Sequence, residues 1–354
     1  MRTAISSNNR VVLAAMTNKQ SHSDGLISKN EIKWLSRRAK DGFGIITTAA
    51  ANISVDGKGW EGEIGVFNDK QISGLKILTS NIRYYGSLSI AQLFHGGMRS
   101  PESLTGVTPI SASKNSCIES ESGFSKACSE NDIVRLIQDF SDAANRCVES
   151  GFDGIELHGA HGYLISQFLG SKSNRRTDKW GGNIAARSRF LIEIYRSIKK
   201  QVPESFLVGV RISPEIDNLG IRLEDSIKLV KILTDQGVDF IHISCWDVFS
   251  RSIEYPNNPK TLTEWFTESV SNLPAIISTG GVWSAKDAQD VLKQGPDLIG
   301  VGRVGIAYPD WAKNLSNIHY APLLPPFSYK HLKNADLSDP FIDYMRKWDG
   351  FVSK

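Results

Sequence analysis

Cysteine is scarce in this chain, which has four cysteines in 354 residues, at positions 117, 128, 147 and 245. No two of them stand in a C-x-x-C spacing, so we expect no iron–sulfur cluster, no structural zinc and no other metal site. So few cysteines in so long a chain are typical of a reducing compartment. We therefore expect a cytoplasmic protein.

Long apolar runs and basic clusters are also missing. No apolar stretch reaches the length of a transmembrane helix, and residues 1–10 contain no apolar core of a signal peptide. The 41 Lys and Arg nearly balance 38 Asp and Glu, for a net charge of +3, and are spread along the chain. We therefore expect no membrane and no nucleic-acid partner. A small-molecule substrate is the expected partner, and self-association as a homo-oligomer stays open.

Short apolar segments alternate with amphipathic helical segments along most of the chain, whose hydrophobic content is 40%. This alternation predicts an α/β protein with a parallel sheet. Eight units in roughly 300 residues predict a closed (β/α)8 TIM barrel with long loops at its C-terminal face, and a doubly wound sheet is the alternative. The expected strands are residues 11–16, 43–48, 87–93, the start of 152–164, 206–212, 240–244, 275–278 and 298–301.

Helices are expected between these strands, most of them ended by glycine. Ser28 and Glu31 match a capping box that begins a helix reaching about Lys40. The further expected helices are residues 69–85, 132–149, 185–202, 223–236, 262–272 and 284–294.

We expect a single domain over residues 1–354, with the barrel at about 10–315 and a C-terminal tail at about 322–354. Residues 98–128 are rich in Ser, Pro, Gly and Thr and show no periodicity, which predicts a long loop acting as a lid or as part of the site wall. We expect this segment and the loop 246–260 to set the substrate pocket. Within the tail, residues 336–348 are expected to dock on the barrel or on a neighbouring molecule.

Residues 152–164 combine a buried strand with chemically useful groups at its end. The apolar start leads into His158, His161 and Tyr163, with glycines between them. Polar side chains at the C-terminal ends of barrel strands form active sites. Two imidazoles can stabilise a developing oxyanion and a phenol can donate a proton, so we interpret these residues as catalytic and substrate-binding. The alternative is a packed loop whose polar groups are structural.

Glycines follow the last two expected strands. Gly280 and Gly281 follow the seventh strand, and Gly302 and Arg303 follow the eighth. Residues 300–305 match G-x-G-x-x-G, but no acidic residue follows at about the twentieth position and no further strand completes a Rossmann unit. We therefore predict a phosphate site at its usual place in barrels. The alternative is that these glycines only permit tight turns.

Polar residues mark the ends of other expected strands. Arg211 lies near the end of the fifth strand, where a buried guanidinium needs an anionic partner. We interpret it as stabilising the charge of a bound cofactor, and the alternative is a salt bridge in the barrel mouth. Thr17, Gln92 and His95 end the first and third strands, and we expect them to project to the same face of the barrel.

Together these residues resemble the old yellow enzyme family of FMN-dependent ene-reductases over about residues 10–315. The segments that carry the resemblance are H-G-A-H-G-Y-L-I-S-Q-F at 158–168, S-N-R-R-T-D at 173–178, W-G-G at 180–182, Q-L-F-H-G-G at 92–97, G-V-G-R at 300–303 and A-Y-P-D at 307–310.

The resemblance implies non-covalently bound FMN, with NADH or NADPH as the reductant. One set of residues would line the flavin ring and another would hold its phosphate. The ring set is Ala15, Met16, Thr17, Ala50, Gln92 and Arg211, and the phosphate set is Gly280, Gly281, Gly302 and Arg303. The resemblance further implies that His158 and His161 bind the carbonyl oxygen of the substrate and that Tyr163 donates a proton to its α-carbon.

The implied reaction is hydride transfer from NAD(P)H via the flavin to the activated C=C bond of an α,β-unsaturated carbonyl compound or a similar electrophile. The first alternative is a flavin-binding redox sensor or interaction protein without ene-reductase turnover, which would not need a proton donor. The second is a barrel without flavin, such as a Schiff-base aldolase, although no lysine falls at an expected strand end.

Overall fold

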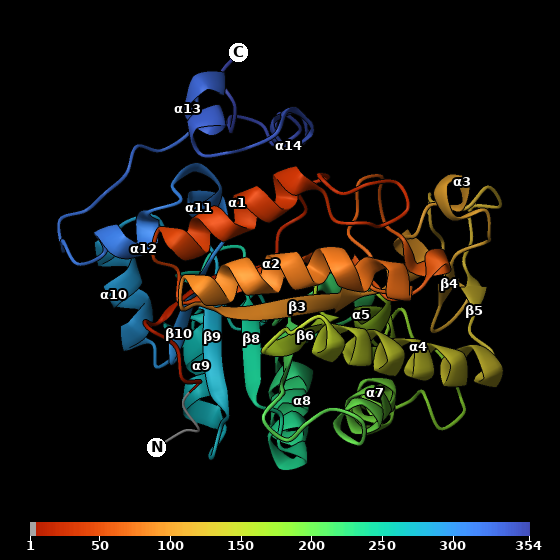
Figure 1. Ribbon diagram of the computed structural model, residues 1–354. Coiled ribbons are helices and arrows are strands. Elements are labelled where there is room, and N and C mark those ends of the chain that lie inside the picture. Colours follow the sequence, from red (N-terminus) through yellow and green to blue (C-terminus); the bar gives the residue numbers. More distant parts are fainter. Residues whose placement is uncertain (1–4) are drawn as a thin grey trace.

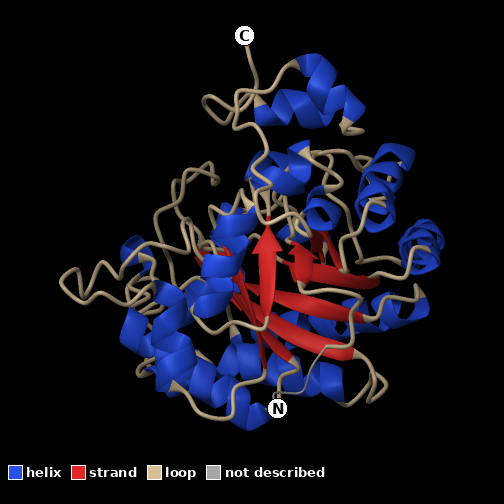
Figure 2. Ribbon diagram, turned by 90° about the vertical axis from the view of Figure 1, so that its left-hand side faces the viewer, coloured by secondary structure: helices blue, strands red, loops and turns tan. Residues whose placement is uncertain are grey.

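Parallel strands and helices alternate along the chain in the computed structural model, which describes residues 5–354. The strands close into a barrel in the order β1-β10-β9-β8-β7-β6-β3-β2, and helices surround it (Figures 1 and 2). This confirms the (β/α)8 barrel and excludes the doubly wound sheet. The barrel strands are β1 (Val11–Leu13), β2 (Ile45–Asn52), β3 (Leu88–Phe94), β6 (Gly154–Gly159), β7 (Leu207–Ile212), β8 (Phe240–Ser244), β9 (Ala275–Thr279) and β10 (Leu298–Val301).

The helices of the described chain vary from one turn to 20 residues. The expected helix at 185–202 is divided at Ser188. The helices are α1 (Lys29–Lys40), α2 (Ile72–Tyr84), α3 (Glu102–Thr105), α4 (Glu130–Glu149), α5 (Leu164–Leu169), α6 (Ile184–Arg187), α7 (Arg189–Lys199), α8 (Leu223–Gln236), α9 (Leu262–Ser269), α10 (Ala285–Lys293), α11 (Arg303–Ala307), α12 (Trp311–Asn314), α13 (Tyr329–Asn334) and α14 (Asp339–Met345).

The start of α1 corrects one prediction. The Ser28 hydroxyl accepts from the Glu31 N–H at 3.1 Å, as a cap should. The Glu31 carboxylate does not complete the box, however, because it accepts from Asn18 at 2.8 Å and Ser21 at 2.5 Å. Glu31 is fully buried, so its carboxylate ties the chain after β1 to α1 instead of capping the helix.

Strand β2 is longer than expected. The prediction ended it at Thr48, but it continues to Asn52, with a register shift against β3 between Thr47 and Ala50. A bulge adds a residue to one strand and re-aims the side chains that follow. The result is that Ala50 lies at the C-terminal end of the barrel.

The barrel interior is filled in layers. The lower layer is apolar, and Gly209 makes room in it: a Cβ atom there would lie 2.2 Å from the Phe240 ring. Two residues further along the strands, the inward positions become polar. The apolar layer consists of Val12, Ile45, Ile90, Phe240, Ala275, Ile277 and Leu298, and the buried polar layer includes Gln92, Glu156, Arg211, His242 and Thr279. The apolar layer therefore closes the barrel below the polar layer, and the polar groups face only the C-terminal ends of the strands.

The segment between β3 and α4 is more ordered than its composition suggested. It contains α3 and a two-stranded parallel sheet of β4 (Ile110–Ser111) and β5 (Lys126–Ala127). Arg175 and Arg176 fasten it: Arg176 donates to the carbonyls of Ala112 at 3.0 Å and Cys128 at 2.6 Å, and Arg175 donates to that of Lys114 at 2.6 Å. These bonds hold the segment against the chain that follows α5.

The C-terminal tail packs on the end of the barrel that lies away from the N-terminus of the chain (Figures 1 and 2). Phe341 of α14 contacts Trp34 of α1 edge-on, with ring centroids 5.3 Å apart. Asp336 pairs with Lys33 at 2.6 Å. Of the two docking partners predicted, the tail therefore uses its own barrel. No helix in residues 5–354 is long and apolar enough to cross a membrane; part of the segment 1–10, assessed above for a signal peptide, lies outside the described residues.

Candidate active site

A cavity of about 880 Å³ opens at the C-terminal ends of the barrel strands. Its volume falls in the range of about 300–1,000 Å³ that is usual for small-molecule and cofactor sites. Every residue predicted to bind the cofactor or the substrate lines this one cavity. They are Ala15, Met16, Thr17, Ala50, Gln92, His158, His161, Tyr163, Arg211, Gly280, Gly281, Gly302 and Arg303.

The chain after β6 turns sharply so that its aromatic side chains converge. His161 has a φ of +60° and Gly162 a φ of +78°, so both lie in the left-handed region. This conformation is uncommon for residues other than glycine and often marks functional sites. It brings the His158 ring to 5.1 Å from that of His161 and 5.0 Å from that of Tyr163, measured between centroids.

Hydrogen bonds bear on which ring nitrogen of each imidazole carries the proton. The Ala160 N–H donates to Nδ1 of His158 at 3.3 Å, which leaves the proton of the neutral ring on Nε2. Arg211 donates to the Ser244 hydroxyl at 3.1 Å, and that hydroxyl lies 2.8 Å from Nε2 of His161. When the Ser244 O–H donates to Nε2 of His161, the hydroxyl is used both as donor and as acceptor, and the proton of the neutral His161 ring is on Nδ1.

Both imidazoles are neutral at neutral pH. Burial, followed by the positive charges of neighbouring groups including Arg211, lowers the pKa of His158 and of His161 well below the usual value. A neutral imidazole with one fixed N–H is a hydrogen-bond donor that brings no net charge. The pair can therefore hold an oxygen atom that becomes negative during a reaction.

Tyr163 stands beside this pair as a protonated phenol. Its ring packs edge-on against Phe94, with centroids 4.5 Å apart. The Arg99 guanidinium lies over the other side, 4.5 Å from the ring centroid, and donates to the His161 carbonyl at 2.7 Å. Burial raises the pKa of the phenol, and Arg99 partly opposes this change. Tyr163 is therefore available as a proton donor at neutral pH.

Arg211 places a buried cation at the end of β7. It donates to the Ala15 carbonyl at 3.1 Å and to Ser244, while its Nε is buried and has no hydrogen-bond partner in residues 5–354. Burial lowers the pKa of the guanidinium and Glu156 opposes this, but arginine stays protonated in proteins. No carboxylate hydrogen-bonds to it, so the predicted alternative of a salt bridge is not realised among the described residues.

Bare backbone and one arginine face the cavity after β9 and β10. A Cβ atom on Gly280 would lie 2.3 Å from the Cys245 carbonyl, and Gly281 has a φ of +70°. Arg303 begins α11, where Gly302 is the N-cap. The buried Arg38 guanidinium donates to the carbonyls of Gly305 at 3.0 Å and Ile306 at 2.7 Å, which fixes α11 and hence the position of Arg303.

Some wall residues belong to the predicted pocket loop at 246–260, and others had no sequence signal. Trp246, in the loop after β8, and Trp348, in the tail, have ring centroids 6.3 Å apart, and Trp246 is 81% exposed. Only the docking of the tail brings these distant positions together. Of the segment expected as a lid, residues 98–128, only Arg99 lines the cavity. The prediction that this segment forms part of the site wall therefore holds for one residue. The wall residues without a sequence signal include Trp60, Glu215, Trp283, Tyr344 and Met345.

One predicted neighbour does not belong to this cavity. His95, after β3, is 2% exposed and lies against η1 (Val55–Gly57), where a Cβ on Gly57 would be 2.5 Å from its ring. Its Nδ1 accepts from the Gly97 N–H at 3.0 Å, and its Nε2 lies 3.6 Å from the Asp56 carboxylate. His95 therefore packs between the loops instead of projecting to the site.

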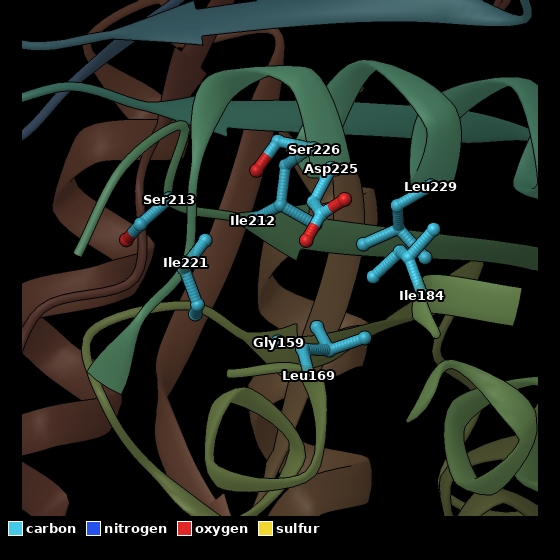
Figure 3. Close-up of a pocket in the computed structure, with 9 residues that line it drawn as sticks. All are labelled: Gly159, Leu169, Ile184, Ile212, Ser213, Ile221, Asp225, Ser226 and Leu229. Atoms are coloured by element: carbon cyan, nitrogen blue, oxygen red, sulfur yellow. The ribbon is translucent and has the colours of Figure 1, made fainter. Parts of the chain in front are cut away.

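A second, much smaller gap lies between the barrel and α8 (Figure 3). Its volume is about 10 Å³, room for no more than one water molecule. Asp225 is its one charged residue, and it pairs with Arg187 at 2.6 Å. Ile212, Ile221 and Leu229 fill most of the remaining wall (Figure 3). We interpret this gap as a packing defect.

Comparison with known proteins agrees with this geometry. Residues 4–320 match the model of the NADH:flavin oxidoreductase / NADH oxidase family. The chain belongs to this family. It is 34% identical over 315 residues to the probable NADH-dependent flavin oxidoreductase YqiG of Bacillus subtilis, covering 88% of this chain and 84% of the relative. It is 36% identical over 320 residues to the NADH:acrylate oxidoreductase of Vibrio harveyi, covering 87% of this chain but 32% of that protein.

The old yellow enzyme homologue from Zymomonas mobilis has the same fold, with a TM-score of 0.80, 23% identity and 97% of each chain covered. The family match confirms the resemblance drawn from the sequence motifs, and the chain is an FMN-dependent NAD(P)H oxidoreductase. Family membership excludes the aldolase alternative and favours an enzyme over a sensor.

The site residues fit the cofactor of this family. FMN is a planar ring that becomes negatively charged when reduced, joined to a phosphate. The buried Arg211 with its unpartnered Nε suits the ring, and the bare glycine backbone beside Arg303 suits the phosphate. Both lie in one cavity, as a single mononucleotide requires.

Proposed function

We propose that this oxidoreductase reduces the activated C=C bond of an α,β-unsaturated carbonyl compound or a similar electrophile. The observation that carries the proposal is the convergence of two neutral imidazole donors and a protonated phenol on one wall of the cavity. Two donors suit an oxygen that gains negative charge, and the phenol suits the carbon beside it. One relative is named for acrylate, an α,β-unsaturated carboxylate.

When bound, FMN supplies the electron-carrying chemistry between NAD(P)H and the second substrate. The side chains around it bind, orient and protonate. Nε2 of His158 and Nδ1 of His161 donate to the substrate oxygen, and the Tyr163 hydroxyl delivers a proton to the α-carbon. The residues proposed to line the flavin ring are Ala15, Met16, Thr17, Ala50, Gln92 and Arg211, and those proposed to hold its phosphate are Gly280, Gly281, Gly302 and Arg303.

Turnover with a defined enone tests the proposal. The FMN-loaded protein is mixed with NADH or NADPH under anaerobic conditions, with or without 2-cyclohexenone. We expect oxidation of the nicotinamide that depends on the enone, with the saturated ketone as the product. Oxidation of NAD(P)H by quinones or oxygen without any saturated ketone would contradict the proposal.

The phosphate assignment has its own test. Arg303→Ala removes the cation beside the glycine backbone, and we expect FMN affinity to fall at least tenfold, because charge-assisted hydrogen bonds contribute roughly 1.5–3 kcal/mol. Arg196→Ala in α7 is the matched control, since the Arg196 guanidinium donates to Gln236 and Glu193 and is not part of the cavity wall among the described residues. Full FMN occupancy of Arg303→Ala at low FMN concentration would show that the phosphate is held elsewhere.

We also propose that the chain works as one domain in the cytoplasm. The tail contributes Tyr344, Met345 and Trp348 to the cavity, which supports one structural unit. The cysteines of the described chain are free, as expected in a reducing compartment.

A further inference from the structure

A chain of short hydrogen bonds crosses the barrel directly beneath the cavity. Gln92 on β3 donates from Nε2 to Glu156 on β6 at 2.6 Å. The other carboxylate oxygen of Glu156 lies 2.6 Å from Nδ1 of His242 on β8. Nε2 of His242 lies 2.6 Å from the Thr279 hydroxyl on β9. Gly300 makes room for that hydroxyl, because a Cβ there would lie 1.7 Å from it.

Only the two ends of this chain reach the cavity. Gln92 and Thr279 belong to the cavity wall, whereas Glu156 and His242 do not. Glu156 is 1% exposed and His242 is fully buried. The two middle residues therefore act on any ligand only through their neighbours or through their charge.

The carboxylate sets the direction of every bond in the chain. An ionised carboxylate can only accept, so Gln92 must turn its amide nitrogen to Glu156 and its amide oxygen away. His242 must likewise carry a proton on Nδ1. Burial lowers the pKa of His242, although Glu156 opposes this, so the ring is neutral and its Nε2 accepts from Thr279. Burial raises the pKa of Glu156, but the hydrogen bonds from His242 and Gln92 and the charge of Arg211 lower it below the usual value, so Glu156 is ionised.

A buried carboxylate needs a reason in this position. Replacing buried charges by apolar residues is often neutral or stabilising, so their presence is weak evidence for a stabilising role. Two residues earlier on the same strands, the inward positions hold Ile90, Phe240 and Ile277, which pack without any polar group. A second apolar layer would therefore fit this barrel. A barrel with that second apolar layer would lack the fixed hydrogen-bond acceptors of Gln92 and Thr279, at the two ends of the hydrogen-bond chain. It would also lack the negative charge near Arg211.

We propose that Glu156 is a positioning residue for the flavin: it holds the Gln92 amide with its oxygen toward the cofactor, and its negative charge offsets that of Arg211. The proposal rests on the flavin placement given under Proposed function. Arg211 alone would favour the negatively charged reduced flavin strongly. Glu156 limits this preference and so lowers the reduction potential of the bound flavin.

The reduction potential of bound FMN tests the charge effect. Glu156→Gln removes the charge at constant size, and we expect the ratio of reduced to oxidised flavin at a fixed poise to rise at least tenfold. For a two-electron couple a tenfold change corresponds to a rise of about 30 mV. Glu156→Asp keeps the charge, so its ratio should stay within about twofold of wild type, while its FMN affinity falls because the shorter side chain withdraws from Gln92.

A neighbouring hydrogen bond provides the control. Ser278 precedes Thr279 on β9 but points outward, where its hydroxyl lies 2.7 Å from that of Thr263. Ser278→Ala also removes a buried hydrogen bond, so it should lower stability and leave the potential unchanged. An unmoved potential in FMN-loaded Glu156→Gln would overturn the proposal. If that variant does not fold, unchanged FMN affinity in Glu156→Asp would overturn it equally.

These measurements need bound FMN but no alkene turnover. Failure of the proposed ene-reduction would therefore appear as an absent saturated product, with the potentials still shifted as expected. The Gln92→Leu variant tests the placement of the flavin. Unaltered FMN affinity and reduction potential in that variant would overturn both the flavin placement and the positioning role of Glu156.

Discussion

Strands β3 and β6 are neighbours in the barrel and each has a histidine at its C-terminal end, yet the two ends differ in the charge of their surroundings. His95, after β3, faces the carboxylate of Asp56, which also pairs with Arg135 at 2.7 Å. Burial raises the pKa of Asp56, but the neighbouring His95 ring and the Arg135 guanidinium lower it below the usual value. This histidine is part of a polar cluster that joins two loops.

The end of β6 has the opposite character. His158 and His161 are surrounded by the cations Arg211 and Arg99, and no carboxylate hydrogen-bonds to either ring among the described residues. Their N–H groups therefore stay neutral donors that face the cavity. The comparison teaches that a histidine at a strand end becomes a ligand-binding group when its neighbours are cations, and a structural group when its neighbour is a carboxylate.

The largest effect that would sharpen this contrast is expected from Tyr163→Phe, at the end of β6. Removing the hydroxyl should leave reduction of the flavin by NAD(P)H near wild type and slow alkene reduction about a hundredfold or more, since a positioned acid contributes that much. Stopped-flow measurement of each half-reaction checks it.

The matched control for Tyr163→Phe is Tyr195→Phe. Tyr195 is also buried, but its hydroxyl donates to the Gly237 carbonyl at 2.7 Å, far from the cavity. Its rates should not change. If Tyr163→Phe instead blocks nicotinamide oxidation and leaves enone reduction intact, the proton comes from another group.

The next largest effect concerns ligand affinity. Phenolates resemble the negatively charged oxygen that the two imidazoles would hold, so His158→Ala and His161→Ala should each weaken binding of a phenol about tenfold, the equivalent of one hydrogen bond to a charged group. His95→Asn should leave this affinity unchanged. Titrations followed by the flavin absorbance measure it, and equal affinities in all three variants would break the contrast between the two strand ends.

The sequence was sufficient to predict the barrel and the cavity residues at the strand ends, because both depend on local patterns. Alternating apolar segments and glycine-ended helices define the barrel, and His158, His161, Arg211 and Gly302 stand at strand ends, where topology brings them together. The same reasoning predicted that His95 projects to the face of the site. His95 instead packs against η1, about 40 residues away in the chain, beside the Asp56 carboxylate.

Longer-range packing explains the other misses. Trp348 reaches the cavity only because Phe341 and Asp336 dock the tail on α1, and no pattern near Trp348 indicates this. Glu156 lies two residues before His158, so its inward direction follows from strand periodicity. Its partners, however, come from β3 and β8, and only the closed barrel brings them within 2.6 Å.

A smaller effect is expected when the β3 end is broken. His95→Asn keeps an acceptor where Nδ1 meets the Gly97 N–H, but removes the ring that packs on Gly57 and approaches Asp56. We expect the free energy of unfolding to fall by about 1–2 kcal/mol, with FMN affinity and both half-reactions unchanged. Urea denaturation together with the rate measurements checks this, and a loss of turnover at unchanged stability would place His95 in the catalytic machinery.

The smallest effect is a difference in how acid destabilises the two strand ends. For His158, the pKa in the folded protein lies well below its unfolded value of about 6.5, so the unfolded chain binds the proton first as pH falls. Each such histidine should therefore remove about 0.7 kcal/mol of stability between pH 7 and pH 6. Asp56 also has a lowered pKa, but as an acid its contribution to stability is fully present above about pH 4 and is lost only below it.

Unfolding free energies at pH 7 and pH 6 should accordingly differ less in His158→Gln than in wild type. Asp56→Asn should be less stable than wild type by the same amount at both pH values. The opposite result would contradict this assignment: a pH dependence of the unfolding free energy that is reduced in Asp56→Asn and unchanged in His158→Gln.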